Sequence, residues 1–369
     1  MTPNANIQPF ITDLPRTLRN GAGLIYFDHV HTAHGYADIL AAARTCGREK
    51  DVLLLDLTVG AAAKTNGNTF NPFAIVDAEA VHRLLVSQIA PAQPQQGTYG
   101  DFFQGRAVGL LGGLSSVLVW LRDSRGLKLN AAVAFRAAAD LRTIAGLAYD
   151  DVFRVPNPST GALTELSLAG MGPLHRSGVA SLREYIDGLA GYNPSLPFDQ
   201  QTSPEPSRQH GYVTFCFWRN FIRLADTFAS IFTCETPDID MGEVVANAGI
   251  LVVRAPSLEA AHESTASLIR LVLTSLRVAV SNRISATFEA VHDVPAIPPP
   301  MFVVLSDADA NTLSDFDKVT TVGRAMGVHF CFGAQIEHAA DQPSKVQFSI
   351  PPSRKNGSTH PGSAFGPAA

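Results

Sequence analysis

Two short apolar runs near the amino terminus, each ending at an aspartate and followed by a helical pattern, constrain the fold most. They are residues 23–28 and 52–56, and both are rich in residues that favour β-strands. Helical periodicity follows the first run over residues 37–44 and the second over residues 77–89. Since strands that alternate with helices are joined by crossovers, this order predicts a parallel sheet.

Later apolar runs predict further strands of the same sheet. They are residues 249–253, 301–305 and 328–332, and a helix predicted over residues 258–287 joins the first two. The middle third, from about residue 99 to residue 232, shows helical periodicity broken by proline and glycine, and no convincing strand pattern. The predicted fold is therefore α/β, a mostly parallel sheet with an inserted all-helical domain.

These patterns divide the chain into predicted segments. Residues 1–92 and 236–340 are the two parts of the α/β domain, and residues 93–235 are the helical insertion, which has the size of an ordinary domain. Residues 341–369 are rich in proline, serine and glycine, a composition that predicts a disordered tail.

The composition is that of a globular protein without a strong electrostatic field for nucleic acid. Hydrophobic residues make up 46% and charged residues 17% of the 369 residues, and the formal net charge is -5. Any bound nucleic acid would therefore need a local basic patch. Neither a C-x-x-C pair, nor a signal sequence, nor an apolar run of about 20 residues is present, so the chain is expected in the cytoplasm.

Ser306 and Asp307 directly follow the apolar run 301–305. In nucleotide-driven motors a buried strand ends in two acids at this place, one for the magnesium shell and one for the attacking water. A serine brings no charge against the cation, so catalytic electrostatics would be weakened. The ordinary alternative is a core strand that ends in a polar loop.

Arg324 and Gln335 bracket the last predicted strand. Either side chain could face a nucleotide phosphate at the carboxyl edge of the sheet. The alternative is a cation favoured by a helix dipole and an amide that caps a strand end.

His29 and His31 form an H-x-H pattern after the first apolar run, as in the metal site of amidohydrolases. That barrel needs eight alternating strand and helix units and further ligands at later strand ends. In this chain the middle third is predicted to be helical, which does not fit such a barrel. The alternative is a pair of solvent-facing loop histidines.

Residues 60–65 resemble a shortened phosphate-binding loop. The true pattern places a glycine directly before the lysine, so that backbone N–H groups can wrap the phosphates. That glycine is missing here, and a surface loop is the alternative.

Several segments, taken in chain order, carry a resemblance to a known family: residues 23–28, 47–56, 68–73, 237–241, 250–253, 256–259, 301–307, 323–327 and 333–335. They resemble the coupling ATPases of type IV secretion systems, especially those of the Dot/Icm type and of conjugative plasmids. The resemblance implies a hexameric RecA-like motor with a lateral all-helical domain that recruits DNA or protein substrates.

The resemblance also implies roles for single residues. Ser306 and Asp307 stand where the two acids of the Walker B strand belong. Arg324 is a candidate inter-subunit arginine, and Gln335 is a candidate γ-phosphate sensor. Asp28 closes a strand of the family's sheet and is the candidate cofactor-binding residue. The helical insertion would be the substrate-facing module.

One departure from the family pattern is large. Members carry a membrane anchor and then a strand with G-x-x-x-x-G-K-[ST] ahead of the segment that matches residues 12–28, and this sequence starts after both. A missing strand in the interior, beside residues 301–305, predicts unpaired backbone groups in the centre of the sheet. Three explanations are open: another polypeptide supplies that strand, the chain is a fragment of a longer gene, or the sheet closes by another route.

The expected function is a divergent or truncated coupling-protein subunit that recruits substrates, with impaired or absent ATP hydrolysis. The alternatives are an active ATPase completed in trans by a separate Walker A polypeptide and a metal-dependent hydrolase that uses His29 and His31. ATP and magnesium are expected only if Walker A is supplied in trans. Expected partners are other secretion or conjugation components, a homo- or hetero-hexamer, and DNA or protein substrates. Contact with the inner membrane is expected only through partners.

Overall fold

A computed structural model of the chain describes residues 8–29, 35–58, 67–89, 97–156, 162–255, 263–289, 299–305, 323–324 and 327–332. Its helices are α1 Gln8–Arg19, α2 Gly35–Thr45, α3 Ala78–Val86, α4 Gly97–Arg125, α5 Ala131–Ala139, α6 Leu141–Ala145, α7 Pro173–Asp187, α8 Glu205–Phe215, α9 Trp218–Ile222, α10 Ala229–Phe232, α11 Met241–Ala246 and α12 Glu263–Glu289. Its strands are β1 Gly23–His29, β2 Val52–Asp56, β3 Val152–Pro156, β4 Leu163–Ser167, β5 Ile250–Ala255, β6 Met301–Leu305 and β7 Val328–Phe332. Short 3-10 turns are η1 Glu49–Asp51 and η3 Phe198–Gln200, and π-helical turns are η2 Gly146–Asp150 and η4 Arg223–Thr227.

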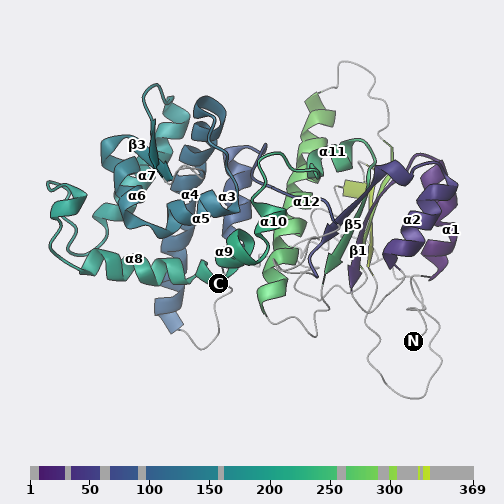
Figure 1. The fold of residues 1–369 in the computed structure, drawn as a ribbon, viewed down its shortest axis with the longest axis horizontal. Helices are drawn as coiled ribbons and strands as arrows, with labels where there is room; N and C mark the ends of the chain where they lie inside the picture. The colour runs from purple at the N-terminus through teal and green to yellow at the C-terminus, as the bar shows by residue number, and fades with distance from the viewer. Residues whose placement is uncertain are drawn as a thin grey trace, which may run out of the picture. The chain divides into compact units, whose positions relative to one another are not determined.

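Among the described residues, a 5-stranded sheet runs in the order β2-β5-β1-β6-β7, and every neighbouring pair in it is parallel. The helical insertion leaves the sheet after β2 and returns before β5, and Figure 1 shows its helices grouped together. The predicted mostly parallel α/β sheet with a helical insertion is thus confirmed, while the predicted domain boundaries stay predictions.

The expectation of unpaired groups in the centre of the sheet is wrong. Residues 23–27 of β1 pair in register with residues 301–305 of β6, so these two strands are direct neighbours. Gly23 makes the fit possible, because a Cβ there would lie 2.5 Å from Met301 and 2.6 Å from the backbone of Ala248. Its amide donates to the carbonyl of Pro300 at 2.8 Å. The sheet closes without an intervening strand.

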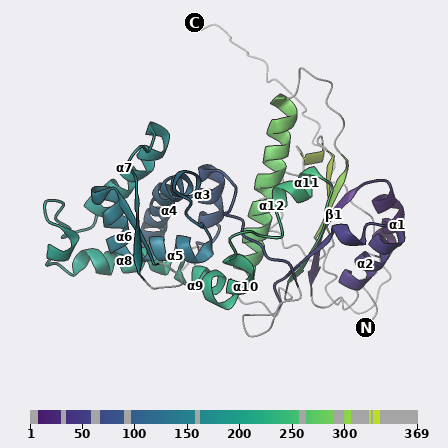
Figure 2. The ribbon, with the colours of Figure 1, turned by 45° about the horizontal axis from the view of Figure 1, so that its top comes forward.

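The two faces of the sheet bury alternate residues of β1, as a strand's period of two requires. Leu24 and Tyr26 pack in one core with α1 and α2, whereas Ile25 and Phe27 belong to the core that includes α12. Figure 2 shows α1 and α2 together on one side of the sheet and α12 on the other. Helix α1 was not predicted from the sequence.

Arg48 links the amino ends of the neighbouring strands β1 and β5 through hydrogen bonds. Its guanidinium donates to the carbonyls of Ala22, just before β1, at 2.6 Å and of Ala248, just before β5, at 2.7 Å. It also pairs with Asp51 at 2.8 Å. Charge-assisted hydrogen bonds are strong, so this part of the family-like segment 47–56 has a structural role.

Helix α4 is the central helix of the insertion and packs against α3 and α7. It crosses α7 at backbone contact, because a Cβ on Gly178 would lie 2.7 Å from the carbonyl oxygen of Gly113. Of the described helices, the stretch Gly100–Arg125 is long and apolar enough to cross a membrane, and half of its most apolar window is buried inside the protein.

The insertion is not all-helical, which corrects the prediction. β3 and β4 form an antiparallel two-stranded sheet within it, with Phe153 paired to Leu166. Phe153 is buried, whereas β4 is almost wholly exposed. An exposed strand carries no alternating apolar pattern, so β4 cannot be recognised as a strand from its residues.

Candidate functional site

Two buried acids and one arginine lie in a row across the carboxyl edge of the sheet. Arg254 of β5 is in register with Asp56 of β2 on one side and with Asp28 of β1 on the other. Its guanidinium contacts the Asp56 carboxylate at 3.3 Å, and that carboxylate also accepts a hydrogen bond from the Thr58 amide at 3.0 Å. Asp28 is 4% and Asp56 6% exposed, so both charges are held out of water.

Helix α2 begins directly against Asp28. A Cβ on Gly35, the first residue of α2, would lie 2.6 Å from a carboxylate oxygen of Asp28. The positive end of the helix dipole therefore faces a buried anion, which is a favourable arrangement. This geometry gives Asp28 a structural partner within the fold, and its predicted role toward a nucleotide stays a prediction.

Gly35→Ala is expected to destabilise the protein by about 2 kcal/mol, because the added methyl group would push against the Asp28 carboxylate and overpack the site. Gly105→Ala is the matched control, since a Cβ at this exposed position of α4 meets nothing within 4 Å. The control is expected to stabilise by about 0.5 kcal/mol through its helix propensity. Urea denaturation measures both, and equal effects of the two changes would contradict the close contact at Gly35.

Of the other predicted site residues, only some are among those that the structure describes. Arg324 is exposed, and its carbonyl accepts a hydrogen bond from the Gly327 amide at 3.2 Å, just before β7. Ser306, Asp307 and Gln335 lie outside the described residues.

The predicted metal pair is likewise mostly outside the described part of the chain. The backbone of His29 ends β1, but neither its side chain nor His31 is described. Within the described ranges, no group of three or more His, Cys, Asp or Glu side chains could hold a metal ion. The metal site stays a prediction.

Two family-like segments form what we call the neck, residues 68–73 leaving the sheet and residues 234–241 returning to it. Asp238 accepts hydrogen bonds from the Thr69 amide at 2.8 Å and from the Thr69 hydroxyl at 2.7 Å. The Ile239 amide donates to the Thr69 carbonyl at 3.0 Å. The hydrogen bond from the Thr69 amide, followed by that from its hydroxyl, lowers the pKa of Asp238 below its ordinary value. These contacts tie the two crossings of the neck together.

Asn71 is the buried centre of the neck and is 2% exposed. Its amide nitrogen donates to the carbonyls of Leu129 and Cys234, each at 2.9 Å, and its side-chain oxygen accepts from the Phe73 amide at 3.1 Å. One side chain thereby joins both crossings to the segment between α4 and α5. The family-like residues of the neck have a structural role that sequence reasoning did not assign.

Sequence reasoning also missed Asp56 and Arg254 as members of the carboxyl-edge row. The signal for Asp56 was present, because it ends an apolar run in the same way as Asp28. The role of Arg254 depends on strand pairing with residues far away in the chain, which sequence alone does not reveal.

Comparison with known proteins agrees with the family resemblance. No protein-family model matches the chain. The type 4 coupling protein DotL of Legionella pneumophila subsp. pneumophila is 28% identical over 342 residues, which cover 89% of this chain and 42% of that protein. The chain thus spans about two fifths of the length of this curated relative.

Two solved structures are also similar at low identity. The plasmid coupling protein TrwB, in complex with the non-hydrolysable GTP analogue GDPNP, has a TM-score of 0.43 and 12% identity over 86% of this chain and 64% of that chain. The trigonal form of TrwBdeltaN70 in complex with sulphate has a TM-score of 0.43 and 14% identity over 87% of this chain and 65% of that chain. The fold described above rests on the strand pairing itself. The match along 89% of this chain supports its resemblance to the coupling proteins of type IV secretion systems.

Proposed function

We propose that this chain is a substrate-recruiting part of a type IV coupling protein whose own ATP hydrolysis is impaired or absent. The observation that carries the proposal is the carboxyl edge of β1, β2 and β5, where the buried acids Asp28 and Asp56 lie in register with Arg254. A phosphate site needs an excess of positive charge or free backbone N–H groups. Among the described residues of this edge, two buried acids and one arginine supply no excess of positive charge.

The sequence supports the same proposal. G-x-x-x-x-G-K-[ST] does not occur within the 369 residues, so hydrolysis here would need that loop from another segment or polypeptide. Ser306 stands in place of an acid ahead of Asp307. Expected partners are other secretion or conjugation components, further subunits of a homo- or hetero-hexamer, and a DNA or protein substrate, with the inner membrane reached through partners.

The neck supports a role for the insertion in recruitment. Thr69 and Asp238 join the two crossings of the neck through charge-assisted hydrogen bonds, and Asn71 joins both crossings to Leu129 of the insertion. A partner bound on the insertion would therefore be fixed to the α/β domain rather than tethered on a loose linker.

Nucleotide binding tests the weak-ATPase proposal. A fluorescent ATP analogue with magnesium is expected to show no saturable binding to the purified chain below about 1 mM. Saturable binding in the micromolar range that is lost in Asp307→Ala would overturn the proposal.

An active ATPase completed in trans is the second candidate, and the edge of the sheet favours it. Among the described residues no strand pairs with the outer side of β7, and an open edge accepts a further strand. In this case a polypeptide that carries a strand and G-x-x-x-x-G-K-[ST] should form a complex with the chain and restore ATP turnover. Turnover that does not need Asp307, or the absence of a complex, would exclude this candidate.

A further inference from the structure

The insertion holds a cavity of about 460 Å³, open on one side, between helices α5 and α6 and strand β3. We call it the groove. Its apolar lining includes Val133, Phe135, Phe153, Val155, Leu163 and Trp218. The rings of Phe135 and Trp218 meet edge to face with centroids 4.9 Å apart, and Trp218 is 45% exposed. A cavity of this size and character is typical of a ligand site.

One wall of the groove is the edge of a strand. Every residue of β3, Val152–Pro156, lines it. Successive side chains of a strand point to opposite faces, so a wall made of consecutive residues presents the backbone edge. In the described part of the chain β3 pairs with β4 alone, so its other edge has no strand partner there. An exposed strand edge is a template for an extended peptide.

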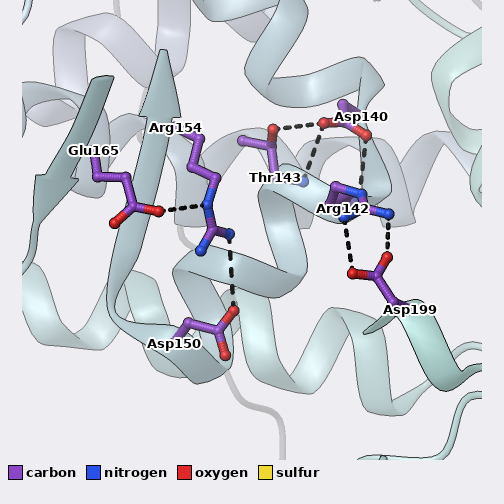
Figure 3. A network of polar contacts seen from close by, with 7 residues as sticks. All are labelled: Asp140, Arg142, Thr143, Asp150, Arg154, Glu165 and Asp199. Carbon is purple, nitrogen blue, oxygen red and sulfur yellow. Dashed lines mark hydrogen bonds and ion pairs between the residues drawn. The ribbon is translucent and has the colours of Figure 1, made fainter. Parts of the chain in front are cut away.

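Two of the three arginines that line the groove form ion pairs with described residues. Arg154 pairs with Glu165 at 2.9 Å and approaches Asp150 at 4.0 Å, and Arg142 pairs with Asp199, as Figure 3 shows.

Asp140, the acid in the lining, is used to cap α6. It accepts hydrogen bonds from the amides of Arg142 and Thr143 at 3.1 and 3.2 Å. Arg136 contacts only the carbonyl of Ala132, at 3.3 Å, among the described residues. Arg136 is therefore a cation of the groove without an ion-pair partner among the described residues.

The geometry points to an extended peptide as the occupant, one that adds as a strand to the free edge of β3 and places a carboxylate against Arg136. This inference rests on the proposed recruiting function and names the class of substrate segment that the insertion takes. Backbone hydrogen bonds to β3 supply affinity without regard to sequence, and apolar side chains at alternate positions fill the groove beside Trp218. The carboxylate supplies charge specificity.

The test uses fluorescein-labelled octapeptides of alternating valine and threonine with aspartate at one central valine position, so that the carboxylate points to the same face as the remaining valines. Matched probes carry lysine in place of the aspartate, or N-methyl groups on the threonine amides, which remove backbone donors. Fluorescence anisotropy is read with the whole chain in the absence of nucleotide and partners. We expect the aspartate peptide to bind at least about tenfold more tightly than either matched probe.

Arg136→Glu is expected to reverse the preference, so that the lysine peptide binds more tightly than the aspartate peptide. Arg208→Glu is the control, because Arg208 is exposed on the insertion outside the groove. Equal affinity for the two charged peptides, an unchanged preference in Arg136→Glu, equal binding of the N-methylated probe, or no binding below about 1 mM would each overturn the inference. The assay contains neither nucleotide nor partners. Such a failure would therefore rule out the groove as the peptide site, but it would not rule out recruitment through another surface.

Discussion

Asn71→Ala is expected to destabilise the protein by about 3 kcal/mol, measured by urea denaturation, and to loosen the neck. The change removes the buried amide that satisfies the carbonyls of Leu129 and Cys234 and the amide of Phe73. A buried polar group left without a partner costs about 1–3 kcal/mol, and alanine leaves three of them. Hydrogen exchange of residues 234–241 should accelerate more than that of the sheet strands.

Asn282→Ala is the matched control for this change. Asn282 is exposed on α12, and its replacement is expected to alter stability by less than about 0.5 kcal/mol. A loss at Asn71 no larger than that of the control, or uniform acceleration of exchange through the whole protein, would contradict the role of the neck.

His210 is expected to make the insertion unstable in acid. It is 4% exposed, and burial lowers its pKa from 6.5 to about 4. Its Nδ1 lies 2.7 Å from the hydroxyl of Tyr185 and its Nε2 lies 3.2 Å from the carbonyl of Ala139. Because a carbonyl only accepts, Nε2 carries the proton and Nδ1 accepts from the tyrosine, so the ring is neutral in the folded protein.

The direction of this pH effect on stability follows from the linkage between proton binding and unfolding. Unfolded His210 takes up a proton below pH 6.5, whereas the folded ring stays neutral to about pH 4. The stabilisation is therefore complete above pH 6.5 and falls by up to about 3 kcal/mol as the pH drops to 4. Urea denaturation at a series of pH values measures this fall, and His210→Gln should remove it. An unchanged pH profile in His210→Gln would contradict the assignment.

The parallel sheet could be predicted because its strands are short apolar runs between turn signals. β2, β5, β6 and β7 all fall on predicted runs, and most helices of the insertion fall on predicted periodicity. Helix α1 escaped prediction because Pro15 stands inside it and few of its residues are apolar. The hairpin of β3 and β4 escaped because β4 faces solvent.

The order of the strands could not be predicted, because pairing depends on contacts between distant parts of the chain. A glycine at position 23 lets β1 fit between Ala248 and Met301, and nothing in a local pattern reveals this. The same limit applies to the candidate site. Asp28 was recognisable as an acid at a strand end, but its neighbour Arg254 is brought to it only by the register of β1 and β5.

We propose that this chain, which resembles the type IV coupling proteins, recruits substrates while its own ATP hydrolysis is impaired or absent. ATP turnover by the purified chain, measured beside Asp307→Ala, tests this proposal most directly. Both proteins are expected to release phosphate at the rate of the buffer alone. Turnover by the unaltered chain that disappears in Asp307→Ala would contradict the proposal.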